Sequence, residues 1–122
     1  MTIAVSGTRR PLTEAEQIRV RYILFDYAAH VLHIGDCPTG VDAFVRSYWP
    51  ENRRQDFLAD WTRGPLAGPI RNGRMLQGCE VLIAFPAVGH QKGTMNAIEQ
   101  AIRAGLEVHV YPLGLSPEGK SP

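Results

Sequence analysis

Three short glycine-containing segments hold most of the residues in this sequence that are suited to chemistry. They are Gly7–Arg10, Gly35–Asp42 and Gly89–Thr94. Each segment follows a short apolar run typical of a strand and precedes a run typical of a helix. A glycine turn between a strand and a helix presents backbone N–H groups to an anion. The three segments therefore predict a site for a phosphate-bearing ligand such as a nucleotide.

In the first segment, Gly7 permits a tight turn and the close approach of a ligand. The hydroxyl of Thr8 and the guanidinium of Arg9 can both hold a phosphate. The alternative is a solvated turn in which Arg9 pairs with a nearby carboxylate. We favour ligand contact, because the turn lies at the end of a predicted strand.

The second segment contains Gly35, Asp36, Thr39, Gly40 and Asp42. Gly40 and the amides that follow it can form an anion-binding start of a helix. Asp42 would then lie in the first turn, where a carboxylate stabilises the helix dipole. Two roles remain open for both aspartates. They cap the helix, or they accept ribose hydroxyls or position a water molecule.

Four further ligand candidates open the last two predicted helices: Arg71, Asn72, Gly93 and Thr94. Arg71 is expected in the first turn of its helix, where a cation is disfavoured by about 0.3–1 kcal/mol. A basic group there implies a compensating anion, either a ligand phosphate, which we favour, or Asp60. Thr94 is suited to N-capping, and the Gly93–Thr94 pair predicts a further phosphate site.

Three residues on neighbouring loops have open interpretations. The ring of Trp61 can stack on a base, or it can serve in core packing or an oligomer contact. His90 and Lys92 either close over a ligand or are ordinary solvated loop residues.

These residues must be positioned by alternating strands and helices. Strands are expected at 2–6, 31–34, 56–61, 80–85 and 107–111, and helices at 13–29, 41–48, 70–77 and from 94 to just before Gly105. Thr13 and Glu16 form a capping-box pattern. Ala15, Ile18, Tyr22, Phe25 and Ala29 recur at the spacing of one helix face, and Ala97, Ile98, Ala101 and Ile102 are expected to face the core.

This alternation predicts an α/β fold, a three-layer Rossmann-like sandwich with a parallel sheet of about five strands. In such sheets ligands bind beyond the carboxyl ends of the strands, near the switch in strand order. All three glycine-containing segments follow strands, so we expect them to share one edge of the sheet.

Length and composition indicate a single domain. The 122 residues are 44% apolar and 20% charged, with a formal net charge of +1. We expect a domain over residues 1–113 and a flexible tail over 114–122, located in the cytoplasm, because no apolar run could cross a bilayer and no signal peptide is evident. The spacing of Cys37 and Cys79 matches no zinc motif. We expect no metal and no cofactor.

The order of the motifs resembles the SLOG superfamily of Rossmann-like domains, which is named for the DNA-processing A protein and the LOG phosphoribohydrolases. The similarity is greatest to a short branch common in bacteria and phages. The matching residues are Val5–Arg9, Gly35–Asp42, Asp60–Trp61, Ala67–Asn72, Met75, Phe85 and Gly93–Thr94. The resemblance implies a nucleotide-type ligand held over the strand ends, and relatives often form dimers through helices that flank the sheet.

The resemblance leaves three functions open. The first is binding of a nucleotide or a nucleotide-derived (phosphoribosyl) ligand at the carboxyl ends of the strands, as in a sensor. The second is hydrolysis of the N-glycosidic bond of a nucleoside monophosphate, with Asp36 or Asp42 positioning water and Arg71 holding phosphate. LOG enzymes use a catalytic glutamate after their Gly-Thr pair, and Ala97 occupies that position here. The third, binding of single-stranded nucleic acid, is disfavoured by the near-neutral charge.

Overall fold

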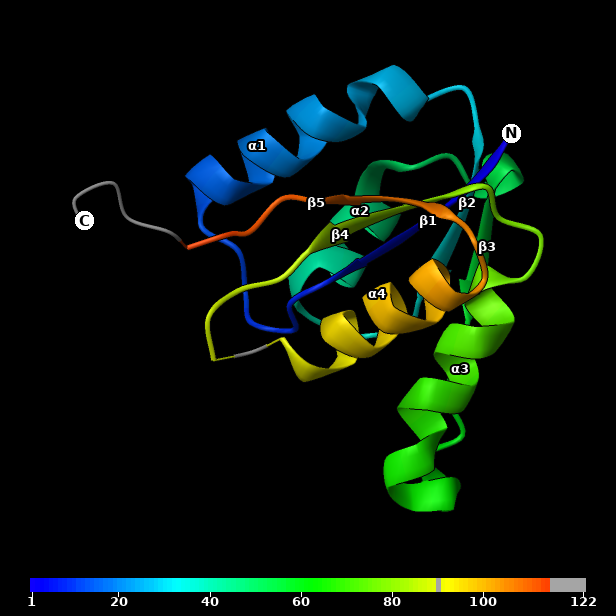
Figure 1. The fold of residues 1–122 in the computed structure, drawn as a ribbon. Coiled ribbons are helices and arrows are strands. Elements are labelled where there is room, and N and C mark those ends of the chain that lie inside the picture. Colours follow the sequence, from blue (N-terminus) through cyan, green and yellow to red (C-terminus); the bar gives the residue numbers. More distant parts are fainter. Residues whose placement is uncertain (90, 115–122) are drawn as a thin grey trace.

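The computed structural model describes residues 1–89 and 91–114 as a five-stranded parallel sheet with helices on both faces (Figure 1). The strands are β1 (Thr2–Gly7), β2 (Val31–Gly35), β3 (Arg54–Phe57), β4 (Val81–Phe85) and β5 (Glu107–Val110). The helices are α1 (Glu14–Leu24), α2 (Gly40–Tyr48), α3 (Ala67–Leu76) and α4 (Lys92–Arg103), with 3-10 segments at Phe25–Tyr27, Glu51–Arg53 and Trp61–Leu66. The predicted Rossmann-like α/β architecture is confirmed.

The strand order is β3-β2-β1-β4-β5, and every neighbouring pair is parallel. The chain moves outward from β1 through β2 to β3, and then returns to the other side of β1 to form β4 and β5. The order therefore switches between β1 and β4. Because β1, β2 and β4 are parallel, the three glycine-containing segments lie at one edge of the sheet, as predicted.

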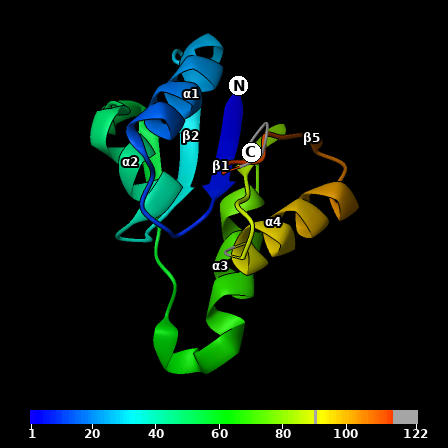
Figure 2. The ribbon, with the colours of Figure 1, turned by 90° about the vertical axis from the view of Figure 1, so that its left-hand side faces the viewer.

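Alternate residues of the central strands fill the core on opposite faces of the sheet. Ile3 and Val5 of β1 pack on the side of α1 and α2. Ala4, Leu82 and Ala84 pack on the side of α3 and α4. Figure 2 shows these two pairs of helices on opposite sides of the strands. Burial of both faces explains why β4 is a continuous apolar run.

Helix α1 begins with the predicted capping box. The Thr13 hydroxyl accepts from the Glu16 amide at 3.2 Å, and the Glu16 carboxylate accepts from the Thr13 amide at 3.0 Å. The guanidinium of Arg10 also donates to Glu16, at 2.8 and 2.6 Å. This second contact lowers the pKa of Glu16 to about 2. The start of the helix is thus fixed by local interactions.

The end and the buried face of α1 differ from expectation. The α-helix ends at Leu24 and continues as a 3-10 turn, instead of reaching residue 29. Val20 and Leu24 are buried against the sheet, whereas the residues at the expected spacing, Ala15, Ile18, Tyr22, Phe25 and Ala29, are exposed. Two stripes of apolar residues have helical spacing in this segment, and the stripe that contains Val20 and Leu24 packs on the sheet.

Other boundaries are also shifted. Strand β3 lies at 54–57 because it pairs with β2 only as far as Gly35, where β2 ends. Helix α3 starts at Ala67, before the expected residue 70. Helix α4 starts at Lys92, so Thr94 is not its N-cap, and Ile102 is exposed. His90 and the expected tail from residue 115 lie outside the described residues.

Among the residues that the structure describes, no helix has both the length and the apolar character required to cross a bilayer.

Candidate functional site

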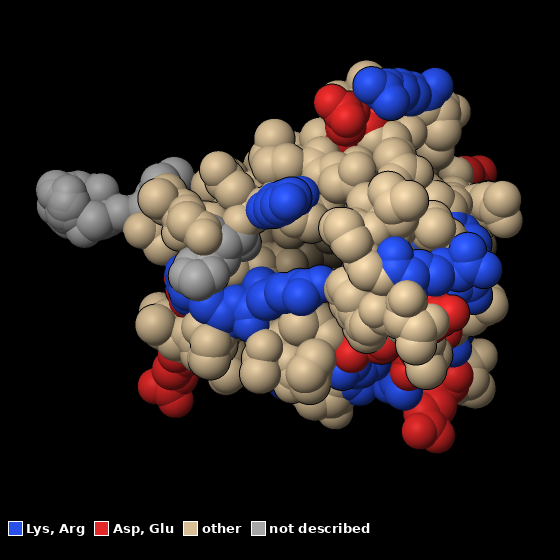
Figure 3. Space-filling model, turned by 90° about the horizontal axis from the view of Figure 1, so that it is seen from below, with Lys and Arg blue, Asp and Glu red and all other residues tan. Residues whose placement is uncertain are grey.

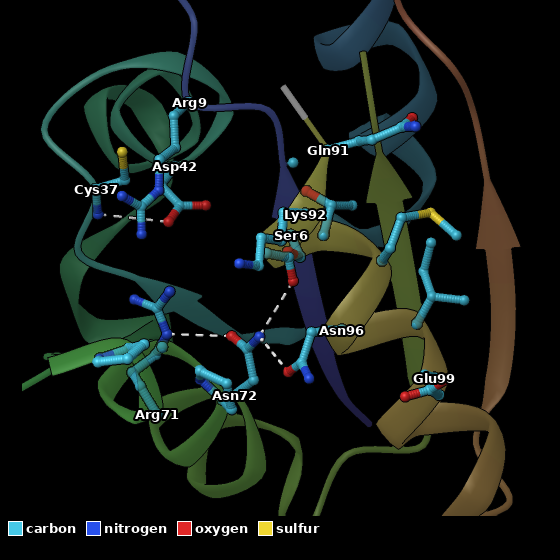
Figure 4. A pocket seen from close by; sticks show the side chains of 18 of the residues that line it. Ser6, Arg9, Cys37, Asp42, Arg71, Asn72, Gln91, Lys92, Asn96 and Glu99 are labelled. Carbon is cyan, nitrogen blue, oxygen red and sulfur yellow. Dashed lines mark hydrogen bonds between the residues drawn. The ribbon is translucent and has the colours of Figure 1, made fainter. Parts of the chain in front are cut away.

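A cleft of about 790 Å³ opens at the carboxyl ends of β1 and β4. Its walls come from the end of β1, the loops after β2 and β4, the Trp61–Leu66 segment, and helices α3 and α4 (Figure 4). This position coincides with the switch in strand order, where open α/β sheets bind ligands.

The cleft collects part of the predicted ligand set. The residues that line it are Gly7, Arg9, Asp42, Arg71, Asn72, Gly93 and Thr94. The cleft lining does not include the remaining candidates, Thr8, Gly35, Asp36, Thr39 and Gly40, and Thr39 and Gly40 border a separate, smaller hollow. Of the three catalytic candidates, Asp42 and Arg71 therefore face the cleft directly.

The first glycine turn contacts the start of α2 through Thr8, Thr39 and Gly40. The carbonyl of Thr8 accepts from the Val41 amide at 3.0 Å, and the Thr39 hydroxyl donates to the Arg9 carbonyl at 2.6 Å. Gly40 has a φ of +74°, and a Cβ there would collide with the carbonyl oxygen of Thr8. The Val41 amide, which was expected to face an anion, is thus bonded within the protein.

Beneath the cleft, Arg71 is paired with Asp36. Its Nη1 atom lies 2.8 Å from Asp36 Oδ1. Arg71 is the fifth residue of α3, so the expectation that it lies in the first turn is wrong, and Asp60 is not its partner. Asp60 instead caps the Trp61–Leu66 segment by accepting from the Thr62 amide at 3.2 Å. The internal anion is therefore a residue from the loop after β2.

Gly35 allows two charged side chains to meet over its Cα atom. A Cβ at this position would lie 2.6 Å from Arg71 Nη1 and 2.6 Å from Asp42 Oδ2. Any larger residue would push these groups into the cleft. Gly35 thus shapes the floor of the site without lining it.

Asp42 is a buried carboxylate at this floor. It is the third residue of α2, and its Oδ2 atom accepts from the Cys37 amide at 3.4 Å. Burial raises the pKa of Asp42 to about 6, against the opposing charges of Arg71 and Arg46. An acid with this pKa can exchange a proton near neutral pH.

Asn72 joins α3 to α4. Its side-chain amide donates to the Gly93 carbonyl at 3.2 Å and to Asn96 Oδ1 at 3.1 Å, and its oxygen accepts from Arg71 Nε at 3.2 Å. Figure 4 shows the two bonds donated by the Asn72 amide crossing from α3 to α4. Asn72 therefore sets the position of the start of α4 relative to the floor of the cleft.

Two basic side chains lie at the rim. The guanidinium carbon of Arg9 is 5.0 Å from the centre of the Trp61 ring, within range of a cation–π contact. Within residues 1–89 and 91–114, no carboxylate lies at ion-pair distance from Arg9 or Lys92. Figure 3 shows basic side chains on both sides of a hollow on this face. Arg9 and Lys92 thus bring positive charge to the rim without a direct ion-pair partner among the described residues.

Sequence reasoning left several lining residues unassigned, among them Ser6, Pro65, Pro69, Gln91, Asn96 and Glu99. For two of these residues the sequence itself contains a signal. Ser6 is a polar residue at the carboxyl end of an apolar strand, and Asn96 lies one helical turn after Lys92. The others depend on the approach of α3 to α4. The described residues contain no group of three or more His, Cys, Asp or Glu that could hold a metal ion.

Comparisons of the chain with protein-family models, with curated proteins and with solved structures gave no significant match.

Proposed function

We propose that the cleft binds a nucleotide or a nucleotide-derived phosphoribosyl ligand. One observation carries this proposal: unpaired cations, the start of a helix, a buried carboxylate and an indole face all border one cleft at the strand-order switch. A volume of about 790 Å³ falls in the range of small-molecule sites. Binding or sensing of such a ligand requires no catalytic step.

The start of α4 supports a phosphate subsite. At the start of this helix, the Met95 amide donates an i to i−4 hydrogen bond to the Gln91 carbonyl, at 2.8 Å. The amides of Lys92, Gly93 and Thr94 precede this bond, and all three residues line the cleft. Amides in this position, together with the Lys92 ammonium, favour an anion. The second cation of the rim, Arg9, adds to the same field.

The opposite side of the cleft supports a sugar and a base. The carboxylate of Asp42 can accept hydrogen bonds from ribose hydroxyls. Trp61, Pro65 and Pro69 supply flat apolar surface at the rim. An exposed indole can stack on any nucleobase, because every base has a π face. These contacts favour a complete nucleotide over free phosphate.

A second candidate function is hydrolysis of the N-glycosidic bond of a nucleoside monophosphate. The pKa of Asp42, near 6 inside the cleft, favours it. In this reaction Asp42 accepts a proton from a water molecule as the water oxygen bonds to the anomeric carbon. The carbon–nitrogen bond breaks, its electron pair goes to the base nitrogen, and Asp42 returns the proton it took from water to the leaving base, so that free base and ribose 5-phosphate are formed and Asp42 is again ionised.

Calorimetric titration and thermal unfolding with nucleoside monophosphates, ribose 5-phosphate and inorganic phosphate test the proposal. A ligand that binds only the folded state raises the unfolding temperature. We expect nucleoside monophosphates to stabilise the protein most, and Lys92→Ala to weaken their binding about tenfold, as a charge-assisted contact of about 1.5 kcal/mol implies. Arg103→Ala, at the far end of α4, is the matched control.

Absence of binding by every nucleotide at millimolar concentration would overturn the proposal. Release of free base during incubation, followed by chromatography, would assign the hydrolytic function instead of simple binding. Equal effects of Lys92→Ala and Arg103→Ala on affinity would show that the phosphate does not bind at the start of α4.

A further inference from the structure

The guanidinium of Arg9 and the indole of Trp61 lie against each other at the rim of the cleft. The guanidinium carbon is 5.0 Å from the centre of the ring, and both residues line the cleft. Arg9 follows β1, whereas Trp61 begins the 3-10 segment after β3, so the contact joins two walls that are far apart in the sequence. Because Arg9 itself lines the cleft, the face of the indole that it covers is the face turned toward a ligand.

No ion pair holds the Arg9 side chain in this place. Within residues 1–89 and 91–114, its guanidinium has no carboxylate at ion-pair distance. Trp61 is 51% exposed. A cation–π contact at an exposed site changes an equilibrium constant by only about two- to fivefold. A ligand that offers a better partner to both groups can therefore replace the contact.

The backbone is anchored on both sides of the contact. The Thr39 hydroxyl donates to the Arg9 carbonyl at 2.6 Å. On the other wall, two residues before Trp61, the Ala59 amide donates to Asp36 Oδ2 at 3.4 Å. Separation of the guanidinium from the indole therefore requires rotation of the Arg9 side chain and no rearrangement of either loop.

A nucleobase and the guanidinium compete for this face of the indole, because both stack on the π face of an aromatic ring. A guanidinium that leaves the ring regains a planar set of N–H donors, which matches a phosphate in a bidentate contact. A ligand with both a base and a phosphate therefore replaces the contact that it breaks. A nucleoside breaks the same contact and offers Arg9 no anion.

We propose that Arg9 determines the specificity of the cleft. By covering Trp61, it disfavours ligands that have a ring without a phosphate, such as nucleosides and free bases. The inference rests on the proposed function, because it takes a nucleotide as the ligand of this cleft. It gives Arg9 a role different from that of Lys92, which attracts a phosphate whatever else the ligand carries.

Acrylamide quenching of tryptophan fluorescence tests the contact in the ligand-free protein. Trp49 is buried, so quenching reports mainly on the exposed Trp61. Arg9→Ala should raise the quenching constant, because the face of the ring is uncovered. Arg21→Ala is the matched control: it removes a guanidinium that lies 4.8 Å from the Tyr48 ring, in a contact between α1 and α2, and should leave quenching unchanged. Equal quenching of the wild type and Arg9→Ala would overturn the proposal.

Calorimetric titration with adenosine, guanosine and their monophosphates tests the specificity. Arg9→Ala should strengthen binding of the nucleosides about two- to fivefold, because they no longer displace a cation. The same variant should weaken binding of the monophosphates about two- to fivefold, because the loss of a charge-assisted contact, worth about tenfold, outweighs the gain at the ring. Arg21→Ala should change neither affinity.

The opposite signs of the two effects separate this role from a merely structural one. A loss of affinity by the same factor for nucleosides and monophosphates in Arg9→Ala, or no change for either, would overturn the proposal. Binding of the monophosphates by the wild type would then still support the proposed function. A wild type that binds none of the four ligands would overturn both.

Discussion

The guanidinium of Arg71 on α3 donates to the carboxylate of Asp36 in the loop after β2, with 2.8 Å between Nη1 and Oδ1. The ion pair joins helix and loop below the cleft, and it places the same guanidinium beside Asp42. Because Asp36 already balances its charge, Arg71 adds little free positive charge. The cations of the site without an ion-pair partner among the described residues are Arg9 and Lys92.

Replacement of Arg71 by alanine should lower the free energy of unfolding by about 1–3 kcal/mol, since Asp36 and Asp42 lose their shared cation in a partly buried place. It should also weaken binding of a nucleoside monophosphate without unfolding the protein. Urea denaturation and calorimetric titration measure the two effects.

Arg103→Ala is the control for Arg71→Ala. Its side chain is largely exposed and lies 3.8 Å from Glu99, so its loss should change stability by less than about 0.5 kcal/mol. Unchanged nucleotide affinity in Arg71→Ala would show that Arg71 does not contribute to ligand binding.

The buried carboxyl of Asp42 should make stability depend on pH. Its pKa rises from 3.8 in the reference state to about 6 in the folded protein. Between these values the folded state keeps a proton that the unfolded state releases, so the contribution of Asp42 to stability falls as pH rises from 4 to 6 and is constant above. The loss is about 3 kcal/mol at 1.36 kcal/mol per unit.

Asp42→Asn should remove this loss. The difference in unfolding free energy between wild type and variant, measured by urea denaturation from pH 4 to pH 8, isolates Asp42 from the other carboxylates. A difference that is constant with pH would contradict the raised pKa of Asp42.

Gly40 and Gly78 offer a matched pair of backbone tests. Both have positive φ angles, +74° and +78°, but a Cβ meets the Thr8 and Arg9 backbone at Gly40 and open space at Gly78. We expect Gly78→Ala to cost about 1 kcal/mol from backbone strain alone. Gly40→Ala should cost about 3 kcal/mol or more, because α2 must move away from β1. Equal costs in thermal or urea unfolding would show that the contact with Thr8 is unimportant.

Substitution of Trp61 should affect binding of the base and not binding of the sugar and phosphate of a nucleotide. Loss of one aromatic–base stack costs about 1–3 kcal/mol, so Trp61→Ala should weaken binding of a nucleoside monophosphate at least fivefold. Binding of ribose 5-phosphate should not change. Trp61→Phe keeps a ring and serves as the control. If both ligands lose affinity equally in calorimetric titrations, the ring acts on the shape of the cleft and not on a base.

Some parts of this organisation follow from local sequence. The Thr13–Glu16 capping box is a contact across three residues, and its pattern alone predicted it. The boundaries of β3 and α3 were wrong because each depends on a partner element. Likewise, Ile18 and Val20 both lie at helical spacing, and local periodicity cannot select which of them meets the sheet.

By itself, the sequence determined the alternation of strands and helices and the edge at which the glycine turns gather, because apolar periodicity and parallel connections are properties of neighbouring residues. Only the tertiary structure decided how that edge is used. The contacts Arg71–Asp36, Asn72–Asn96 and Gly40–Thr8 join residues 24 to 35 positions apart. Their geometry comes from the packing of helices on the sheet, and this packing turns Thr8 into a buried support and leaves Asp42 facing the cleft.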